Sequence, residues 1–355
     1  MGHLLFPLLD RGLVLIVLSS NQMLNYLFGF LRINVIAYIA TMKKSVWLSL
    51  LAAVGFAACS PGARTKSKVS IPPTVENTLL WRISGNGLAK PSYLFGTMHM
   101  ICANDIGVSD SLKQAISQAD KVYLELDMDD MMGMMLSAMT KMTMRGDTTL
   151  SDLLSPEEYN KVKGFFQEKS GGLLPFAVVE KFKPLLVGSM IVEQMQSCEN
   201  MIVMEQLVMT EAGKHNKEIE GLETIDFQLG IFDRIPYRTQ ALQLLKMIEE
   251  SGKEGDDSEM KILTDAYRNQ ELNKMLELTM NEKSIEGFTD VLLYNRNEDW
   301  AQKLKGLMSK NALVIAVGAG HLPGERGVIN LLRKAGYKVE PVRNDMIMEK
   351  KAEEI

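Results

Sequence analysis

The sequence is poor in histidine and cysteine, with four and three of these residues among 355. It contains neither HExxH nor CxxC, which excludes a zincin-like peptidase and a structural zinc site of paired cysteines. It also lacks a sustained run of lysine or arginine, and its net charge of −5 gives no electrostatic footprint for nucleic acid. With 46% hydrophobic residues, the chain is instead typical of a globular protein of one large or two ordinary domains.

Near the N-terminus, no stretch between residues 13 and 58 supplies the ~20 consecutive apolar residues that a membrane span needs. The segment MKKSVWLSLLAAVGFAACSPG, which begins at Met42, has a basic start, an apolar middle and small residues before Cys59. This order is typical of a bacterial lipoprotein signal peptide, whose final cysteine becomes the lipidated first residue, although Phe56 stands where leucine is usual. The alternative is that residues 13–58 hold membrane helices that stay attached.

The lipoprotein interpretation places the protein in the cell envelope, lipid-anchored and either periplasmic or associated with the outer membrane. The segment after Cys59 is rich in Ser, Pro, Gly and Lys, which predicts a flexible tether. The expected parts of the chain are an upstream extension absent from the mature protein (1–41), a signal peptide (42–58), the tether (59–77), a folded domain (78–345) and a charged tail (346–355).

The folded part contains two segments with the same order of a strand, a Gly-x-x-His turn, a helix and a second strand. The first runs from SYLFGTMHM through the helix SLKQAISQAD, which we expect Ser111 and Gln114 to cap, to the strand KVYLELDM. The second runs from ALVIAVGAGH through a helix that begins near Val328 to the strand KVEPV. This repeated order predicts an α/β fold with a mixed sheet that contains parallel neighbours.

Between these two segments, residues 128–310 are mostly helical by pattern and form a large helical insertion. LSPEEYNKVKGFF predicts a helix with Ser155 as N-cap and Glu158 closing a capping box. PYRTQALQLLKMIEES and DWAQKLKGLMSK are further amphipathic helices, and KEIEGLET predicts one more strand that ends near Glu223.

His99 and His321 are the histidines of the two Gly-x-x-His turns, and both follow apolar strands. Glycine permits a tight turn there, and open α/β sheets bind ligands at the carboxyl ends of their strands. We therefore expect these two imidazoles, far apart in the sequence, to form two walls of one site. The alternative is that each histidine has a structural role.

Charged and polar residues near other strand ends are candidates to complete this site. Glu125 in VYLELDM and Glu223 in IEGLET supply carboxylates, unless they face water, and the alternation in KVYLELD leaves the face of Glu125 undecided. In YNRNEDW, Arg296 and Asn297 clamp a carbonyl or carboxylate, or Asn297 merely caps the following helix.

A dinucleotide and Cu(I) are weaker alternatives as ligands of this protein. VGAG opens a helix after a strand and is followed by Glu340, but Pro323 stands at the third glycine position of a dinucleotide-binding motif and too little chain follows. The methionines between residues 128 and 144 are typical of adaptable core or groove lining, with Cu(I) ligation as the alternative.

The pair LFGTMHM and AVGAGHLPGERGVINLLRKAGYKVEPV, with ELD, GLET and RNEDW between them, resembles the TraB/GumN family over roughly residues 78–343. This family is similar to the Tiki metalloproteases, whose two Gly-x-x-His motifs and a glutamate are taken as a metal-dependent peptidase centre. The resemblance implies that His99, His321 and Glu125 are metal ligands. More distant relatives resemble erythromycin esterases and haem-binding lipoproteins.

Two imidazoles and a carboxylate suit Mn²⁺, Co²⁺, Fe²⁺ or Zn²⁺ and leave positions open for water, whose pKa such an ion lowers from about 16 toward about 7. Glu223 or Glu125 is then the expected general base, with Arg296 or Asn297 at the developing oxyanion. The expected function is hydrolysis of a peptide or a small ester. The alternative is a binding protein that captures a peptide or haem without turnover.

Only Cys102 and Cys198 remain once Cys59 is lipidated. In an oxidising compartment two cysteines can pair, so a disulfide between them is expected, and two buried free thiols are the alternative.

The lipoprotein interpretation predicts that a Cys59→Ser protein is no longer labelled by a radioactive fatty acid and is released from membranes, because it lacks the thiol that carries the lipid. Membrane fractionation with labelling measures both effects. Continued membrane attachment of the Cys59→Ser protein would favour retained membrane helices.

Overall fold

A computed structural model of the chain describes residues 75–102, 106–127, 131–169, 175–195, 201–251, 259–280 and 288–346. All of them belong to one compact unit. The predictions for the signal peptide, for Cys59 and for most of the tether and tail fall outside the described residues. Of the described helices, none is long and apolar enough to cross a membrane.

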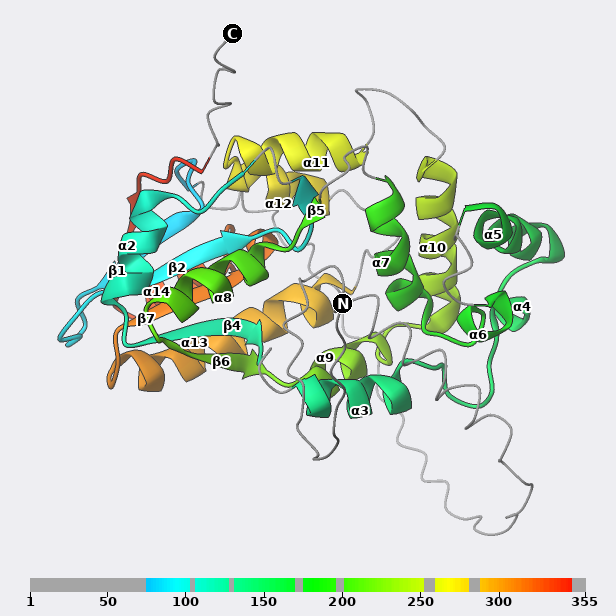
Figure 1. Cartoon of the computed structure of the whole chain (residues 1–355), viewed down its shortest axis with the longest axis horizontal. Coiled ribbons are helices and arrows are strands. Elements are labelled where there is room, and N and C mark those ends of the chain that lie inside the picture. Colours follow the sequence, from blue (N-terminus) through cyan, green and yellow to red (C-terminus); the bar gives the residue numbers. More distant parts are fainter. Residues whose placement is uncertain are drawn as a thin grey trace, which may run out of the picture. The chain divides into compact units, whose positions relative to one another are not determined.

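The fold is built on a mixed six-stranded sheet in the order β6-β4-β7-β2-β1-β8 (Figure 1). Strands β6, β4, β7 and β2 are parallel neighbours, whereas β1 runs antiparallel to both β2 and β8. The predicted α/β fold with a mixed sheet is therefore confirmed. The strands are β1 (Leu80–Ser84), β2 (Ser92–Thr97), β4 (Lys121–Leu126), β6 (Glu218–Glu223), β7 (Leu313–Gly318) and β8 (Lys338–Val342).

The middle strands are buried on both faces. In β4 the residues from Val122 to Glu125 are all buried, as are those from Leu313 to Val317 in β7. Parallel strands with helices on both faces form continuous apolar runs instead of alternating patterns. Alternation within KVYLELD could therefore not place Glu125, which is buried although it is charged.

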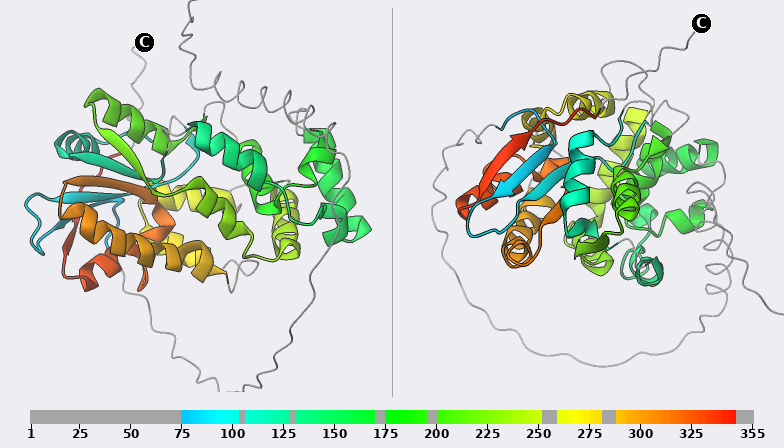
Figure 2. Two further views of the ribbon diagram at one scale, coloured as in Figure 1. Left: turned by 90° about the horizontal axis from the view of Figure 1, so that it is seen from below. Right: turned by 60° about the vertical axis from the view of Figure 1, so that its left-hand side comes forward.

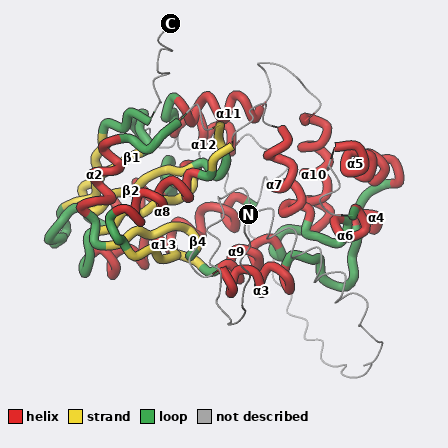
Figure 3. The backbone as a smooth tube through the Cα atoms, in the orientation of Figure 1, coloured by secondary structure: helices red, strands yellow, loops and turns green. Residues whose placement is uncertain are grey.

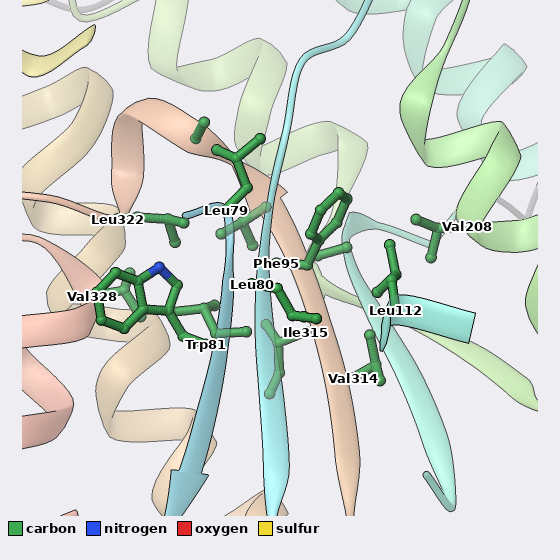
Figure 4. Close-up of a cluster of buried hydrophobic side chains, with 14 of the residues drawn as sticks. Leu79, Leu80, Trp81, Phe95, Leu112, Val208, Val314, Ile315, Leu322 and Val328 are labelled. Atoms are coloured by element: carbon green, nitrogen blue, oxygen red, sulfur yellow. The ribbon is translucent and has the colours of Figure 1, made fainter. Parts of the chain in front are cut away.

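Helices pack on both faces of the sheet (Figure 2). One face is covered by α2 (Asp110–Gln118) and α8 (Met204–Lys214), and the other by α13 (Asn295–Met308) and α14 (Val328–Lys334). Figure 4 shows Leu112 and Val208 on one side of the strands and Trp81 and Val328 on the other, all at most 1% exposed. Burying each such side chain contributes about 1.5–3 kcal/mol, which makes the sheet a rigid base for groups at its edge.

The start of α2 differs from the prediction. Its N-cap is Ser109, whose hydroxyl accepts the backbone N–H of Leu112 at 3.1 Å. The expected cap by Ser111 and Gln114 is wrong, because Ser111 already lies inside the helix and the extended backbone of Ser109 provides the cap geometry two residues earlier.

The large helical insertion is confirmed between β4 and β7 (Figure 3). The predicted capping box is present, since Ser155 N–H donates to the Glu158 carboxylate at 2.7 Å and Glu158 N–H donates to the Ser155 hydroxyl at 3.3 Å. The helices are α3 (Met131–Lys141), α4 (Leu150–Leu153), α5 (Pro156–Lys169), α6 (Phe176–Val179), α7 (Pro184–Met195), α9 (Ile225–Phe232), α10 (Tyr237–Ser251), α11 (Glu259–Arg268) and α12 (Leu272–Met280), followed by the π-helical turn η2 (Asp290–Tyr294).

A second, two-stranded sheet joins the segment after His99 to the segment before α8. It consists of β3 (Ile101–Cys102) and β5 (Met201–Ile202), which pair antiparallel with Cys102 opposite Met201. Cys102 is disulfide-bonded, and the cysteine that pairs with it lies outside the described residues. The predicted pairing with Cys198 remains a prediction, because Cys198 lies outside the described residues.

A Cys102–Cys198 disulfide would close a long loop, which stabilises the fold by up to about 4–5 kcal/mol in the chain-entropy model. A Cys59→Ser protein, denatured without reductant, should therefore show no titratable thiol. Two thiols per chain in that titration would rule the disulfide out.

Candidate functional site

The two Gly-x-x-His turns lie side by side at the carboxyl edge of the sheet. Thr97 at the end of β2 is the register partner of Gly318 at the end of β7. His99 follows β2 by two residues, and His321 ends the 3₁₀ turn η3 (Ala319–His321) that follows β7. Both histidines therefore leave the sheet from neighbouring parallel strands.

The glycines of these motifs have a packing role. A Cβ atom on Gly96 would lie 2.9 Å from the Leu322 side chain and 3.1 Å from Ala319 Cα, so a larger residue would push the two turns apart. A Cβ atom on Gly318 would lie 3.2 Å from Glu125 Oε1. The motif thus brings the β2 turn, the β7 turn and a carboxylate of β4 into close contact.

His321 is buried, and a side-chain amide holds its ring. Asn297 Nδ2 donates to the carbonyls of His321 and Arg326 at 3.3 and 2.9 Å, which orients Asn297 Oδ1 toward His321 Nδ1 at 2.6 Å. Nδ1 therefore carries the proton, and Nε2 accepts a hydrogen bond from Arg296 Nη1 at 3.2 Å. Asn297 lies inside α13, so its alternative role as a helix cap is wrong.

Arg296 joins the carboxylates at the ends of β4 and β6. Its Nε and Nη2 atoms donate to Glu223 at 2.9 and 2.8 Å, and Nη2 also donates to Glu125 at 2.6 Å. The side chains of Arg296 and Glu125 are each 11% exposed and that of Glu223 is 1% exposed. Two buried carboxylates at one sheet edge thus share one buried guanidinium.

The surroundings of Glu125 and His321 shift the pKa values of both side chains. Burial alone raises the pKa of Glu125, but the positive charges of protonated His321 and of Arg296, with the Gly318 N–H, lower it to about 2. Glu125 is therefore ionised at neutral pH, and the stability linked to its low pKa is lost as the pH falls from about 4.5 toward 2. Burial lowers the pKa of His321 to about 4, so its ring is neutral at pH 7.

Sequence reasoning missed two residues of the cluster. Trp300 Nε1 donates to Glu223 at 2.9 Å, and its ring lies 4.5 Å from the ring of His321. Gln228 of α9 donates to both carboxylates, at 3.2 and 3.0 Å. Trp300 follows Arg296 by four residues, and this helical spacing was the signal that it shares the arginine's face.

His99 has a different environment, with its side chain 73% exposed. Its Nδ1 lies 2.9 Å from Oε1 of Glu205, which is buried near the start of α8, and this hydrogen bond raises the pKa of His99 to about 9. Sequence reasoning also missed Glu205, which lies more than a hundred residues from His99 in the chain.

Imidazole nitrogens and carboxylate oxygens are donor types that a divalent metal can use. Both histidines place Nδ1 against a side-chain oxygen and leave Nε2 to other partners, as second-shell groups orient metal-bound histidines. Within the described part of the chain, however, no three His, Cys, Asp or Glu residues are grouped closely enough to hold an ion. His321 Nε2 and Glu125 Oε1 are 3.9 Å apart, and Arg296 bonds to both residues. An ion would have to replace that arginine as their partner.

A cavity of about 400 Å³ adjoins Glu223. It lies along β6, with the Lys303 and Phe227 side chains in its wall, and Asp127 borders it at the end of β4. The Lys303 ammonium donates to the Leu222 carbonyl at 2.9 Å, so a cation lines this space beside the carboxylates.

The fold and the site define an α/β protein with two Gly-x-x-His turns beside a buried Glu-Arg-Glu cluster. The sequence model of the TraB/PrgY/gumN family matches residues 79–341, and the chain belongs to this family. The resemblance inferred from the motifs is thereby confirmed.

Similar curated proteins are Tiki metalloproteases at low identity. Metalloprotease TIKI1 of Danio rerio is 23% identical over 346 residues, covering 83% of this chain and 68% of that protein. Metalloprotease TIKI2 of Xenopus tropicalis is 23% identical over 317 residues, covering 74% of this chain and 60% of that protein. A Metalloprotease TIKI homolog of Amphimedon queenslandica is 26% identical over 366 residues, covering 86% and 68%. No solved structure matches the chain significantly.

The buried cluster predicts a large stability loss in an Arg296→Met protein. Without the guanidinium, Glu125 and Glu223 remain buried with no compensating charge, which costs about 3–5 kcal/mol. Urea denaturation of chelator-treated protein measures the free energy of unfolding. The control is Arg326→Met, which breaks partly exposed ion pairs with Asp290 and Glu298 and should cost only about 0–1 kcal/mol. Equal losses in the two variants would contradict the assigned role of Arg296.

Proposed function

We propose that this protein is a metal-dependent hydrolase of peptide or ester bonds, held at the cell envelope by lipidated Cys59. The observation that carries the proposal is the pairing of β2 with β7, which leads both histidines of the Gly-x-x-His motifs to one sheet edge beside Glu125. Membership of the family and the metalloprotease names of its relatives support the same class of reaction.

His99, His321 and Glu125 are the residues that we assign to the metal, with Mn²⁺, Co²⁺, Zn²⁺ or Fe²⁺ as suitable ions. Such an ion, when bound, supplies a hydroxide-like nucleophile at neutral pH and polarises the carbonyl under attack. Asn297 bonds to Nδ1 of His321 and leaves Nε2, which accepts a hydrogen bond from Arg296, as the unprotonated nitrogen. Glu205 holds the His99 ring.

The hydrogen bonds of the two carboxylates indicate which of them is free for the proposed acid–base role. Glu223 accepts hydrogen bonds from Arg296, Trp300 and Gln228 on its two oxygens, which uses its acceptor capacity. Glu125 Oε1 accepts one hydrogen bond, from Gly318 N–H. We therefore assign the acid–base role to Glu125. Glu223 has the role of holding Arg296.

Asn297 and Arg296 also have different roles, one in positioning and one in contact with the substrate. Both donors of the Asn297 amide already bond to backbone carbonyls, so its role is to position His321. Arg296 carries a permanent charge beside His321 and Glu125, and it is the group that we assign to the negative charge that develops on the substrate oxygen.

Loss of either imidazole should remove most bound metal and most activity, because a site that lacks one ligand neither holds the ion nor activates its water. We would purify His99→Ala, His321→Ala and the double variant without chelator and measure metal content and hydrolysis of a peptide library. The double variant should be no worse than either single variant, as expected of groups that act as a unit.

The matched control is His215→Ala, since His215 pairs with Glu211 on α8 away from this site. Normal metal content and turnover in folded His321→Ala protein would contradict the proposal. Peptide binding without turnover that survives loss of His99 would favour peptide capture instead, and a Soret band in purified protein would favour haem.

A further inference from the structure

We infer that Glu205 is a positioning residue that orients His99 and leaves its Nε2 as the nitrogen that binds the metal. This inference rests on the proposed function. Glu205 belongs to no sequence motif, and only the folding of the chain brings it close to His99.

The contact between Glu205 and His99 is well defined. Glu205 Oε1 accepts hydrogen bonds from His99 Nδ1 at 2.9 Å and from the Thr97 hydroxyl at 2.7 Å. The Glu205 side chain is 12% exposed, whereas that of His99 is 73% exposed. A largely exposed imidazole has little packing to hold it, so the hydrogen bond to a buried carboxylate is its main restraint.

The fold brings the two residues together through the β3–β5 pair. Ile101, two residues after His99, pairs with Ile202, three residues before Glu205. Glu205 lies in the first turn of α8, where the helix dipole favours an ionised carboxylate. An ionised carboxylate only accepts hydrogen bonds, so His99 Nδ1 must donate and Nε2 is left for another partner.

The second carboxylate oxygen of Glu205 makes no hydrogen bond within the described part of the chain. This oxygen, Oε2, is buried. Such a group costs free energy when it is buried, so its presence in a folded protein needs an explanation. The arrangement mirrors Asn297 and His321, where a side-chain oxygen also holds Nδ1. In both turns a side-chain oxygen thus bonds to histidine Nδ1, from Glu205 in one and from Asn297 in the other.

The test compares Glu205→Ala with Glu205→Gln in the full chain. In the metal-free protein at a pH where the His99 ring is neutral, nitrogen NMR of wild type should show the proton on Nδ1. Glu205→Ala should move it to Nε2, the usual preference of a free imidazole. Co²⁺ titration followed by visible absorption, at the same pH where the His99 ring is neutral in both proteins, should show affinity about 10- to 100-fold weaker in Glu205→Ala. Glu205→Gln should lose less, because its amide oxygen can still accept from Nδ1.

The matched control is Glu211→Gln, which alters another glutamate–histidine pair on the same helix and should leave Co²⁺ affinity unchanged. If His99→Ala weakens Co²⁺ binding but folded Glu205→Ala keeps wild-type affinity, the role of Glu205 is overturned and the proposed function stands. If His99→Ala binds Co²⁺ as wild type does, the proposed function fails. Should Glu205→Ala not fold, an Nε2–H ring in neutral wild-type His99 would still overturn the inference.

Discussion

The charge of Arg296 between two buried carboxylates is the interaction on which the site depends. Glu125 and Glu223 end neighbouring parallel strands, and without a cation their burial together would be strongly unfavourable. The guanidinium also donates to the Leu292 carbonyl within the π-helical turn that leads into α13. The bonds from Arg296 to Glu125 and Glu223 tie the start of α13 to the sheet edge. π-Helical turns are frequent at functional sites.

With the start of α13 held at the sheet edge, Asn297 and Trp300 of this helix determine the orientation and protonation of His321. Asn297 bonds to the ring and the carbonyl of His321, and Trp300 packs against that ring. The same tryptophan donates to Glu223, so the helix, β6 and the β7 turn form one hydrogen-bonded unit. A neutral His321 with an unprotonated Nε2 follows from this packing rather than from any local property of the Gly-x-x-His sequence.

The sequence predicts the elements of this fold better than the contacts between them. Apolar runs and the Ser155–Glu158 box identify strands and helices because these depend on local spacing. The Gly-x-x-His motifs could be paired because strand ends meet at one edge of a sheet. The face of Glu125 could not be read from alternation, since both faces of β4 are covered, and Glu205 could not be found because only the β3–β5 pairing brings it to His99.

The two histidines, alike in motif, differ in chemistry because their surroundings differ. His321 lies within the packed core, where burial lowers its pKa to about 4, and an uncharged amide holds it. The His99 side chain is largely exposed and bonds to the ionised carboxylate of Glu205, and that hydrogen bond raises the pKa of His99 to about 9. The motif therefore determines where each ring leaves the sheet, and α13 and α8 determine its charge. A repeated sequence pattern thus produces two histidines with different surroundings, one buried and neutral and the other exposed and hydrogen-bonded to Glu205.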